Sequence, residues 1–255
     1  MEDMLLSMYV FKDSERREKL SVKDATERDK GVRYFCPNPR CDARMFLWNL
    51  EGESKSFFRA SGTPGHVENC PFGSDNTYNP NNVKEEGFDS DDAIARLMIG
   101  GNIQTGTGGS SDKHGSGEIK EIVPHTIGQI YDMCKAHYCK DTFNGQVIGQ
   151  ILVDGRSIYM YPKGIYGYRL IEARCRTRLY DRASIFLETP VNTVKYQLEL
   201  RIKDAELFRE IRDLLYANRD HVVVVAGKWE ASGTYNCFVT EFNNKKQIKV
   251  TKQII

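Results

Sequence analysis

Four cysteine and histidine residues between positions 36 and 70 constrain the fold of this chain more than any other feature of its sequence. Cys36 and Cys41 form a C-x4-C pair, His66 and Cys70 form an H-x3-C pair, and 24 residues separate the two pairs. Two soft ligands on one tight turn, a spacer of hairpin length and two more ligands on a second turn fit a tetrahedral metal site. Three thiolates and one imidazole favour zinc over hard cations, which prefer oxygen ligands.

The residues around the two pairs fit a small module built around a metal ion. Pro37 and Pro39 bend the first ligand loop. Residues 45–50 and 55–59 have the composition of strands, with a turn sequence between them. We expect a zinc ribbon-like module with one zinc ion per chain. Its role would be structural, because four protein ligands leave no coordination position open. The alternative is a set of free thiols and a surface histidine.

A glycine-rich segment divides the chain. Gly100–Gly117 contains seven glycines in eighteen residues, and most of its other residues are small or polar. Such a sequence cannot bury enough apolar surface to offset the entropy lost on ordering. We therefore expect a flexible linker at 100–120. It would separate a zinc-binding module with a closing helix at 1–99 from a helical segment at 121–165 and a last domain at 166–255.

The segment Ser90–Ile99 is predicted to be the closing helix. Ser90 can cap its first turn, two aspartates favour its positive end, and a glycine follows its last residue. Ile94, Leu97 and Met98 fall on one face of this helix. We expect that face to dock on the residues that precede the helix.

Beyond the linker, a helix pattern gives way to a strand pattern. Apolar residues recur at helical spacing from residue 126 to about residue 138. Later on, alternation of apolar and polar residues indicates a series of strands. The predicted order is strands at 170–180, 183–189 and 194–202, a helix at 204–218, and strands at 221–230, 235–242 and 247–251.

This order of elements is typical of the OB-fold, a five-stranded barrel with one helix. The stretch VVVVAGKWE…YNCFVTEFNNKKQIKV also resembles the last strands of OB-fold proteins. An open α+β sheet is the alternative, because element order alone does not close a barrel. We expect an α+β protein, in which the zinc ribbon-like module is tethered to a C-terminal OB-fold-like β-barrel with a helical lead-in.

Three arginines mark the first of these strands. Arg174, Arg176 and Arg178 alternate with apolar residues, so their side chains point the same way at intervals of about 7 Å. Arginine forks bind phosphates, and neighbouring aromatic rings are typical of single-strand binding. The predicted nucleic-acid-binding residues are these three together with Tyr180, Lys195, Arg201 and Trp229. The alternative is a solvated outer face on which Glu172 and Glu199 pair with some of the arginines.

Composition limits the class of protein. The net charge is only +1, which excludes a wholly basic nucleic-acid binder, although residues 151–255 hold 18 basic and 12 acidic side chains. No apolar run approaches the roughly 18 residues of a membrane span, and the acidic start does not follow the order of a signal peptide. We therefore expect a cytoplasmic protein with no membrane partner, whose seven cysteines do not form a disulfide framework.

The fragments YFCP and FFRA…H are the most specific parts of a resemblance that covers residues 7–70. Over this span the chain resembles the N-terminal region of competence protein CoiA-like proteins. This resemblance implies a zinc-binding module and an association with DNA processing, often followed by a nuclease domain. No Asp…Glu-x-Lys nuclease core is evident after residue 100, since the nearest candidate, at Glu199, has Arg201 where the lysine should be. The resemblance therefore supports a DNA connection rather than hydrolysis.

Other constellations are weaker. Cys134, His137 and Cys139 lie close together, but a second metal site there would need His125 or Cys175 as a fourth ligand. The alternative is that Cys134 belongs to the apolar face of its helix. No Ser-His-Asp arrangement or nucleophile elbow is evident.

We expect a non-enzymatic nucleic-acid-binding protein with a structural zinc ion, which holds single-stranded DNA in a DNA-processing or defence context. One alternative is a nuclease or its accessory subunit. The other is a protein–protein adaptor, whose barrel binds a peptide and whose zinc module binds a protein partner.

Overall fold

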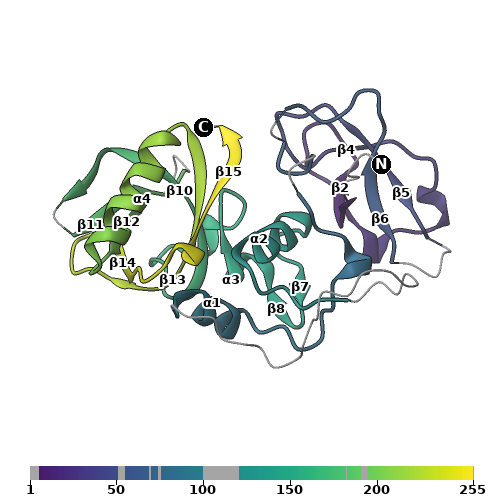
Figure 1. Cartoon of the computed structure of the whole chain (residues 1–255). Coiled ribbons are helices and arrows are strands. Elements are labelled where there is room, and N and C mark those ends of the chain that lie inside the picture. The colour runs from purple at the N-terminus through teal and green to yellow at the C-terminus, as the bar shows by residue number, and fades with distance from the viewer. Residues whose placement is uncertain are drawn as a thin grey trace, which may run out of the picture.

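The computed structural model is a mixed α+β protein in which a helical segment joins two β-rich parts (Figure 1). It describes residues 6–50, 55–68, 70–73, 76–99, 121–181, 183–190 and 195–254. The side chains of residues 177–179 lie outside this description, as does the predicted linker at 100–120. None of the described helices is long and apolar enough to cross a membrane.

The N-terminal part is a curled antiparallel sheet, whose described strands lie in the order β1-β6-β5-β4-β2-β3. The strands are β1 (Leu6–Ser7), β2 (Tyr9–Phe11), β3 (Lys19–Ser21), β4 (Tyr34–Phe35), β5 (Arg44–Trp48) and β6 (Phe57–Ala60). Two short 3-10 helices, η1 (Val22–Asp24) and η2 (Glu27–Asp29), connect β3 to β4. The β5–β6 hairpin corresponds to the strands predicted at 45–50 and 55–59. Met45 and Leu47 point into the core of this part, because alternate residues of a strand face opposite sides.

The middle of the chain is helical with short hairpin pieces. Its elements are η3 (Pro80–Asn82), α1 (Ser90–Met98), α2 (Ile127–Ala136), β7 (Thr142–Phe143), β8 (Gln146–Val147), α3 (Ile148–Ile151), β9 (Leu152–Val153) and η4 (Ile158–Met160). The helix predicted from residue 126 is confirmed as α2, which Thr126 caps through the backbone N–H of Gln129. Asn144 and Gly145 turn the β7–β8 hairpin with φ values of 47° and 76°, in the left-handed region that these residues tolerate.

Helix α1 is found where the sequence predicts it, but it packs on a different partner. Its cap is Asp89, whose carboxylate accepts from the N–H of Asp92, rather than Ser90. Ile94 and Leu97 are buried in a cluster with barrel residues, which are Leu170, Val224 and Ala226. Phe88 belongs to the same cluster, but the barrel is the main partner. The expectation that α1 docks on the residues before it is therefore wrong, and α1 lies against the C-terminal part (Figure 1).

The C-terminal part contains a closed five-stranded barrel. Its elements are β10 (Gly167–Asp181), β11 (Ser184–Glu188), β12 (Gln197–Arg201), α4 (Ala205–Ala217), β13 (His221–Ala231), β14 (Cys237–Glu241), η5 (Lys245–Gln247) and β15 (Ile248–Ile254). The barrel order is β10-β11-β12-β14-β13, and β13 pairs again with β10. The β12–β14 pair is parallel and the other barrel pairs are antiparallel. The predicted barrel is confirmed, and the open-sheet alternative is excluded.

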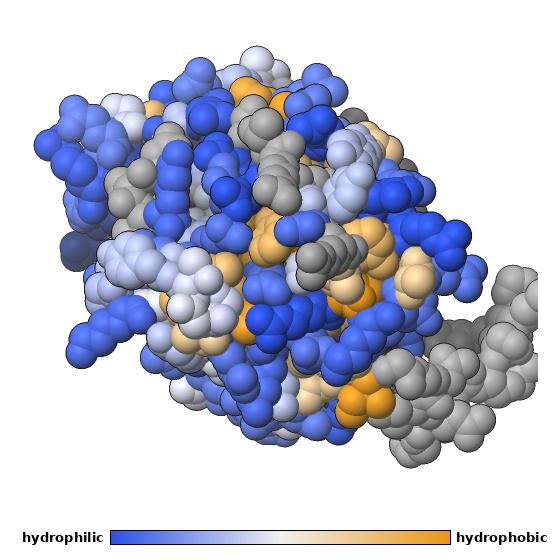
Figure 2. Space-filling model, turned by 90° about the vertical axis from the view of Figure 1, so that its left-hand side faces the viewer, coloured by the Kyte–Doolittle hydropathy of each residue, from blue (hydrophilic) through white to orange (hydrophobic). Residues whose placement is uncertain are grey.

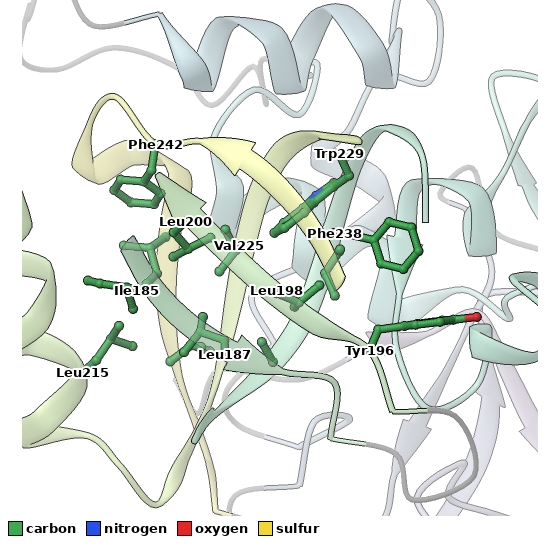
Figure 3. Close-up of a cluster of buried hydrophobic side chains, with 14 of the residues drawn as sticks. Ile185, Leu187, Tyr196, Leu198, Leu200, Leu215, Val225, Trp229, Phe238 and Phe242 are labelled. Carbon is green, nitrogen blue, oxygen red and sulfur yellow. The ribbon is translucent and has the colours of Figure 1, made fainter. Parts of the chain in front are cut away.

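Inward-facing side chains fill the barrel (Figure 3). Leu187, Leu198, Leu200 and Val225 are completely buried, and aromatic rings pack around them. Leu215 of α4 belongs to the same cluster, so that helix packs on the barrel core through its apolar face. Outside, the barrel side of the molecule is mainly hydrophilic, with small separate groups of apolar residues (Figure 2).

Candidate metal centre and candidate nucleic-acid interface

The four predicted metal ligands come together at the end of the N-terminal sheet. One ligand atom from each of Cys36, Cys41, His66 and Cys70 lies within 4.8 Å of all the others. The sulfurs of Cys36 and Cys70 are 3.8 Å apart, and the sulfur of Cys41 is 3.4 Å from Nδ1 of His66. All three cysteines are buried. The cluster has the size and composition of a site for one metal ion.

Strand pairing positions the first ligand turn. Cys36 follows β4 and Cys41 precedes β5, and the antiparallel pairing of these strands closes the loop between them. The Cys36 N–H donates to the carbonyl of Ala43, and the Cys41 N–H donates to that of Asn38. Asn38 also donates to two sulfurs: its backbone N–H to Cys36 and its side-chain amide to Cys70, both at 3.4 Å. These donors favour the thiolate forms, because they place N–H dipoles at the sulfurs.

Arg16 supports the same turn from outside, and sequence analysis missed it. Its guanidinium donates to the carbonyls of Cys36 at 3.1 Å, Asn38 at 2.9 Å and Cys41 at 2.9 Å. Arg16 therefore fixes the backbone that carries two of the ligands. No spacing rule connects residue 16 to the cysteines, because the interaction forms only when the β2–β3 loop folds over the turn.

The second ligand turn depends on a glycine. The Cys70 N–H donates to the carbonyl of Val67, and the Gly73 N–H donates to that of Cys70 at 2.8 Å. A Cβ atom on Gly73 would lie 3.0 to 3.1 Å from the backbone oxygen and Cβ of Cys70 and the Cβ of His66. A side chain there would crowd both ligand residues, which would have to give way by a few tenths of an ångström.

The pKa values of the ligand side chains favour a bound cation. Hydrogen bonding with Cys36 lowers the pKa of the Cys70 thiol to about 4 and that of Cys41 to about 6. Burial raises the pKa of Cys36 itself. For His66, burial opposes protonation, but Cys70 and Cys41 outweigh it and raise the pKa of the imidazole. Among the described residues, no group bonds to the buried Nε2 of His66. The excess of buried thiolate fits a bound metal ion.

The predicted nucleic-acid-binding arginines have different surroundings. Nε of Arg174 lies 2.8 Å from Glu188, and Nε of Arg201 lies 2.9 Å from Glu199. Both arginines are paired with glutamates on the outer face, as the alternative interpretation holds, although Arg174 pairs with Glu188 instead of Glu172. Lys195 is exposed, and the side chain of Arg178 is outside the described residues.

Trp229 is fully buried, so the prediction that it contacts nucleic acid is wrong. Its ring belongs to the barrel core, and its indole N–H donates to the carbonyl of Arg169 at 3.2 Å. Alternation along β13 places it on the same inward face as Val223 and Val225. The sequence therefore contained the signal for its burial.

Arg176 and Tyr180 belong to a group that sequence analysis did not identify as a whole. We call it the α4 patch, and it consists of Arg176, Tyr180, Arg212, Tyr216 and Arg219. Tyr180 and Tyr216 are 39% and 44% exposed, with ring centroids 6.3 Å apart. Arg212 lies over the first ring and Arg219 over the second. A surface depression of about 460 Å³ is lined by Arg176, Tyr216 and Arg219, together with Asp220.

The patch contains acidic as well as basic groups. Arg212 also pairs with Asp213 at 2.8 Å. Its basic groups nevertheless outnumber these two carboxylates, and its rings are accessible. Helix spacing brings Arg212 and Tyr216 to one face of α4, and Arg219 follows the end of the helix. Only packing against β10 adds the other two residues.

The weaker cysteine and histidine group does not form a metal site. Cys134, His137 and Cys139 are all buried, yet the only cluster of ligand type among the described residues is the one around Cys36. Cys134 packs in the apolar cluster under α2, as its alternative interpretation holds. Nδ1 of His137 is 2.9 Å from the carbonyl of Met133, so this ring is held by its own helix.

A buried ionic group joins the two parts of the molecule, and sequence analysis missed it. This junction cluster consists of Lys135, Asp154, Arg156 and Glu172. Nζ of Lys135 lies 3.1 Å from Asp154 and 2.9 Å from Glu172, and Nε of Arg156 lies 2.8 Å from Asp154. Burial alone would raise the pKa of Asp154, but Arg156 and Lys135 outweigh it and hold that pKa below its usual range. The cluster is electrically balanced, with two cations and two anions, as burial requires.

The alternative interpretation places Glu172 on a solvated outer face, but α2 covers that face of β10. A cleft of about 430 Å³ opens above the junction cluster, between the metal-ligand turns and the last strands.

No family model, no curated protein and no solved structure matches this chain. Its function is therefore inferred from its own residues.

Proposed function

We propose that this chain is a non-enzymatic, cytoplasmic nucleic-acid-binding protein, in which a zinc ion stabilises the N-terminal module and an OB-fold-like barrel contacts single-stranded DNA. The α4 patch is the observation that carries the barrel's part in this proposal. Its arginines can pair with phosphates, and its exposed tyrosine rings can stack with unpaired bases.

The connectivity of the barrel supports the proposal by analogy of fold. Three antiparallel strands, a helix, and two more strands, with the third and fifth strands parallel, is the arrangement of OB-folds. Barrels of this type commonly receive oligonucleotides on their outer surface. Fold alone does not establish function; the exposed rings and cations of the α4 patch are the features that indicate nucleic-acid binding.

The distances in the Cys/His cluster support zinc. Four ligands at the corners of a tetrahedron with Zn–S bonds of about 2.3 Å place two sulfurs about 3.8 Å apart. The sulfurs of Cys36 and Cys70 are separated by 3.8 Å. With a Zn–N bond of about 2.0 Å, a sulfur and an imidazole nitrogen fall about 3.5 Å apart, and the corresponding distance from Cys41 to His66 is 3.4 Å. A site with four protein ligands stabilises the fold and supplies no catalysis.

The resemblance of residues 7–70 to CoiA-like proteins favours a DNA-processing or defence context for this binding. The hairpin between the two ligand turns supports the ribbon-like description of the module. Among the described residues, the Cys/His cluster is the only group that could hold a metal ion, and the carboxylates of the junction cluster are paired with Lys135 and Arg156. That part of the chain therefore offers no carboxylate cluster for a metal-dependent nuclease.

Binding to labelled oligonucleotides at several salt concentrations tests the proposal. Replacing Arg176, Arg212 and Arg219 with alanine should weaken binding of single strands and reduce the salt slope, by about 0.7 for each phosphate that is no longer neutralised. The matched control replaces Arg174 and Arg201, which glutamates already neutralise, and should change the slope much less. Equal effects of the two variants would remove the α4 patch from the proposal. Metal-dependent cleavage of the oligonucleotide would favour the nuclease alternative, and absence of binding at low salt would favour the adaptor.

A further inference from the structure

The outer face of the N-terminal sheet carries arginines and aromatic rings in alternation. Along β5, Met45 and Leu47 point inward, so Arg44, Phe46 and Trp48 point outward. Antiparallel pairing then places Phe35 of β4 opposite Arg44, and Arg59 of β6 opposite Phe46. None of these five outward residues is among the nucleic-acid-binding residues predicted from the sequence.

Each arginine on this face lies against a ring. The guanidinium of Arg44 is 3.7 Å from the ring centre of Phe35, that of Arg59 is 5.3 Å from Trp48, and that of Arg33 is 5.9 Å from Phe46. We call these six residues the arginine–aromatic face. A guanidinium that stacks on a ring keeps its second flat side and its edge donors available for a ligand.

The arginines of this face have no acidic partner in the part of the chain that the structure describes. There, no carboxylate lies within ion-pairing distance of Arg33, Arg44 or Arg59, whereas Arg174 and Arg201 on the barrel have glutamate partners. Trp48 is 48% exposed. A shallow depression of about 540 Å³ lies over this part of the sheet, and Phe46, Trp48 and Arg59 line it.

We propose that the arginine–aromatic face is a second binding surface for single-stranded nucleic acid, with bases stacked on Trp48 and Phe46 and phosphates held by the three arginines. Outward residues of one strand are about 7 Å apart, a spacing that suits successive units of an extended strand. Bases of a duplex are stacked on one another and cannot reach the rings. An acidic peptide would satisfy the arginines, but it would leave the indole without a flat partner.

The surface lies on the N-terminal sheet, separate from the α4 patch on the barrel (Figure 1). The inference concerns the same class of partner as the proposed function but does not depend on the barrel. Tryptophan fluorescence separates the two, because the chain has only two tryptophans, Trp48 and Trp229. Trp229 is completely buried and provides a constant background.

Titration of the full-length protein with a twelve-residue oligothymidylate is the test. Stacking should quench the emission of Trp48, and Trp48→Phe should remove the quenching while affinity changes by less than about threefold. Trp48→Ala removes the platform and should weaken binding about 5- to 150-fold, since stacking contributes about 1–3 kcal/mol per base. Replacing Arg44 and Arg59 with alanine should reduce the salt slope by about 0.7 each. Metal content and circular dichroism equal to the parent's show that each variant is folded.

Heparin, a polyanion without bases, is the matched probe. The inference requires that heparin leave the emission of Trp48 largely unchanged at concentrations that bind the protein. Equal quenching by heparin, or no quenching by oligothymidylate, overturns it. The alanine variant of the α4 patch should retain the quenching of Trp48. If the α4-patch variant loses salt-dependent binding but keeps the quenching of Trp48, both surfaces are supported. If that variant binds the oligonucleotide as the parent does and also keeps the quenching, only the barrel surface is rejected.

Discussion

Arg16 shows how a single residue outside the ligand set can control a metal site. Its guanidinium reaches three backbone carbonyls of the first ligand turn. An arginine can do this because its five N–H donors are held in one plane. The turn carries Cys36 and Cys41, so its stiffness sets how precisely two of the four ligands meet the ion.

Elemental analysis of the parent protein should find one zinc per chain, and Cys36→Ser should lose it and unfold the N-terminal module.

Removing Arg16 should weaken metal binding without abolishing it. Arg16→Ala should retain the zinc but bind it about 10- to 100-fold more weakly in a chelator competition, the usual effect of removing a residue that orients a ligand. Arg17→Ala, at an exposed neighbouring position, is the control. Affinity equal to the parent's in Arg16→Ala would contradict this role, and a parent free of metal with an intact N-terminal module would contradict the zinc site.

At the scale of elements, α2 has two tasks. Its apolar side chains cover the outside of β10 and β13 next to α1. It also delivers Tyr131 and Lys135 to Glu172, so that the carboxylate on the covered face is satisfied. At its C-terminal end, His137 packs edge-to-face against Tyr78 and Phe143.

Burial lowers the pKa of His137, and this has a consequence for stability. A histidine whose pKa is lower in the folded state resists protonation there, so the folded state binds fewer protons than the unfolded chain. Its contribution is complete above the unfolded value of about 6.5 and decreases as pH falls below it. Urea midpoints measured at pH 7.5 and 5.5 should differ less for His137→Phe than for the parent. His125→Gln, at an exposed histidine, should keep the parent's difference in urea midpoint between the two pH values. If His137→Phe also keeps that difference, the burial of His137 is not the cause of the pH dependence.

On the scale of the whole molecule, the junction cluster connects the metal module to the barrel. Arg156 donates to the hydroxyl of Tyr9 in β2 at 3.2 Å while it pairs with Asp154 beside the barrel. Met8 donates to the carbonyl of Ala136 across the same boundary, and Lys19 pairs with Asp141 at 2.9 Å. The two parts therefore share a buried polar interface, and their relative position depends on it.

Asp154→Asn should be strongly destabilising, because it leaves Lys135 and Arg156 buried with one anion between them. Loss of one partner from a buried ionic group costs about 3–5 kcal/mol. Chemical denaturation should show a loss of this size, and the unfolding of the two parts should separate. Asp92→Asn removes an exposed ion pair on α1 and should have little effect. A loss near that of the control would show that the junction cluster does not hold the parts together.

The sequence alone determined the features that depend on neighbouring residues. Ligand spacing on two turns identified Cys36, Cys41, His66 and Cys70, because each pair is brought together by its own short loop. Period-two and helical patterns located most strands and helices of the barrel, since burial on one face leaves a local trace. Alternation along β13 carried the signal for the burial of Trp229, but the prediction followed its aromatic character and assigned it to the surface.

Only the tertiary structure decided which surfaces are covered. The pattern of β10 separates its two faces, but whether Glu172 meets water depends on α2, which is far along the chain. In the same way, α1 has one apolar face, and only chain folding selects the barrel as its partner. Arg16, the junction cluster and the arginine–aromatic face all depend on residues from separate elements. Their chemistry results from long-range packing, which leaves no periodic signal in the sequence.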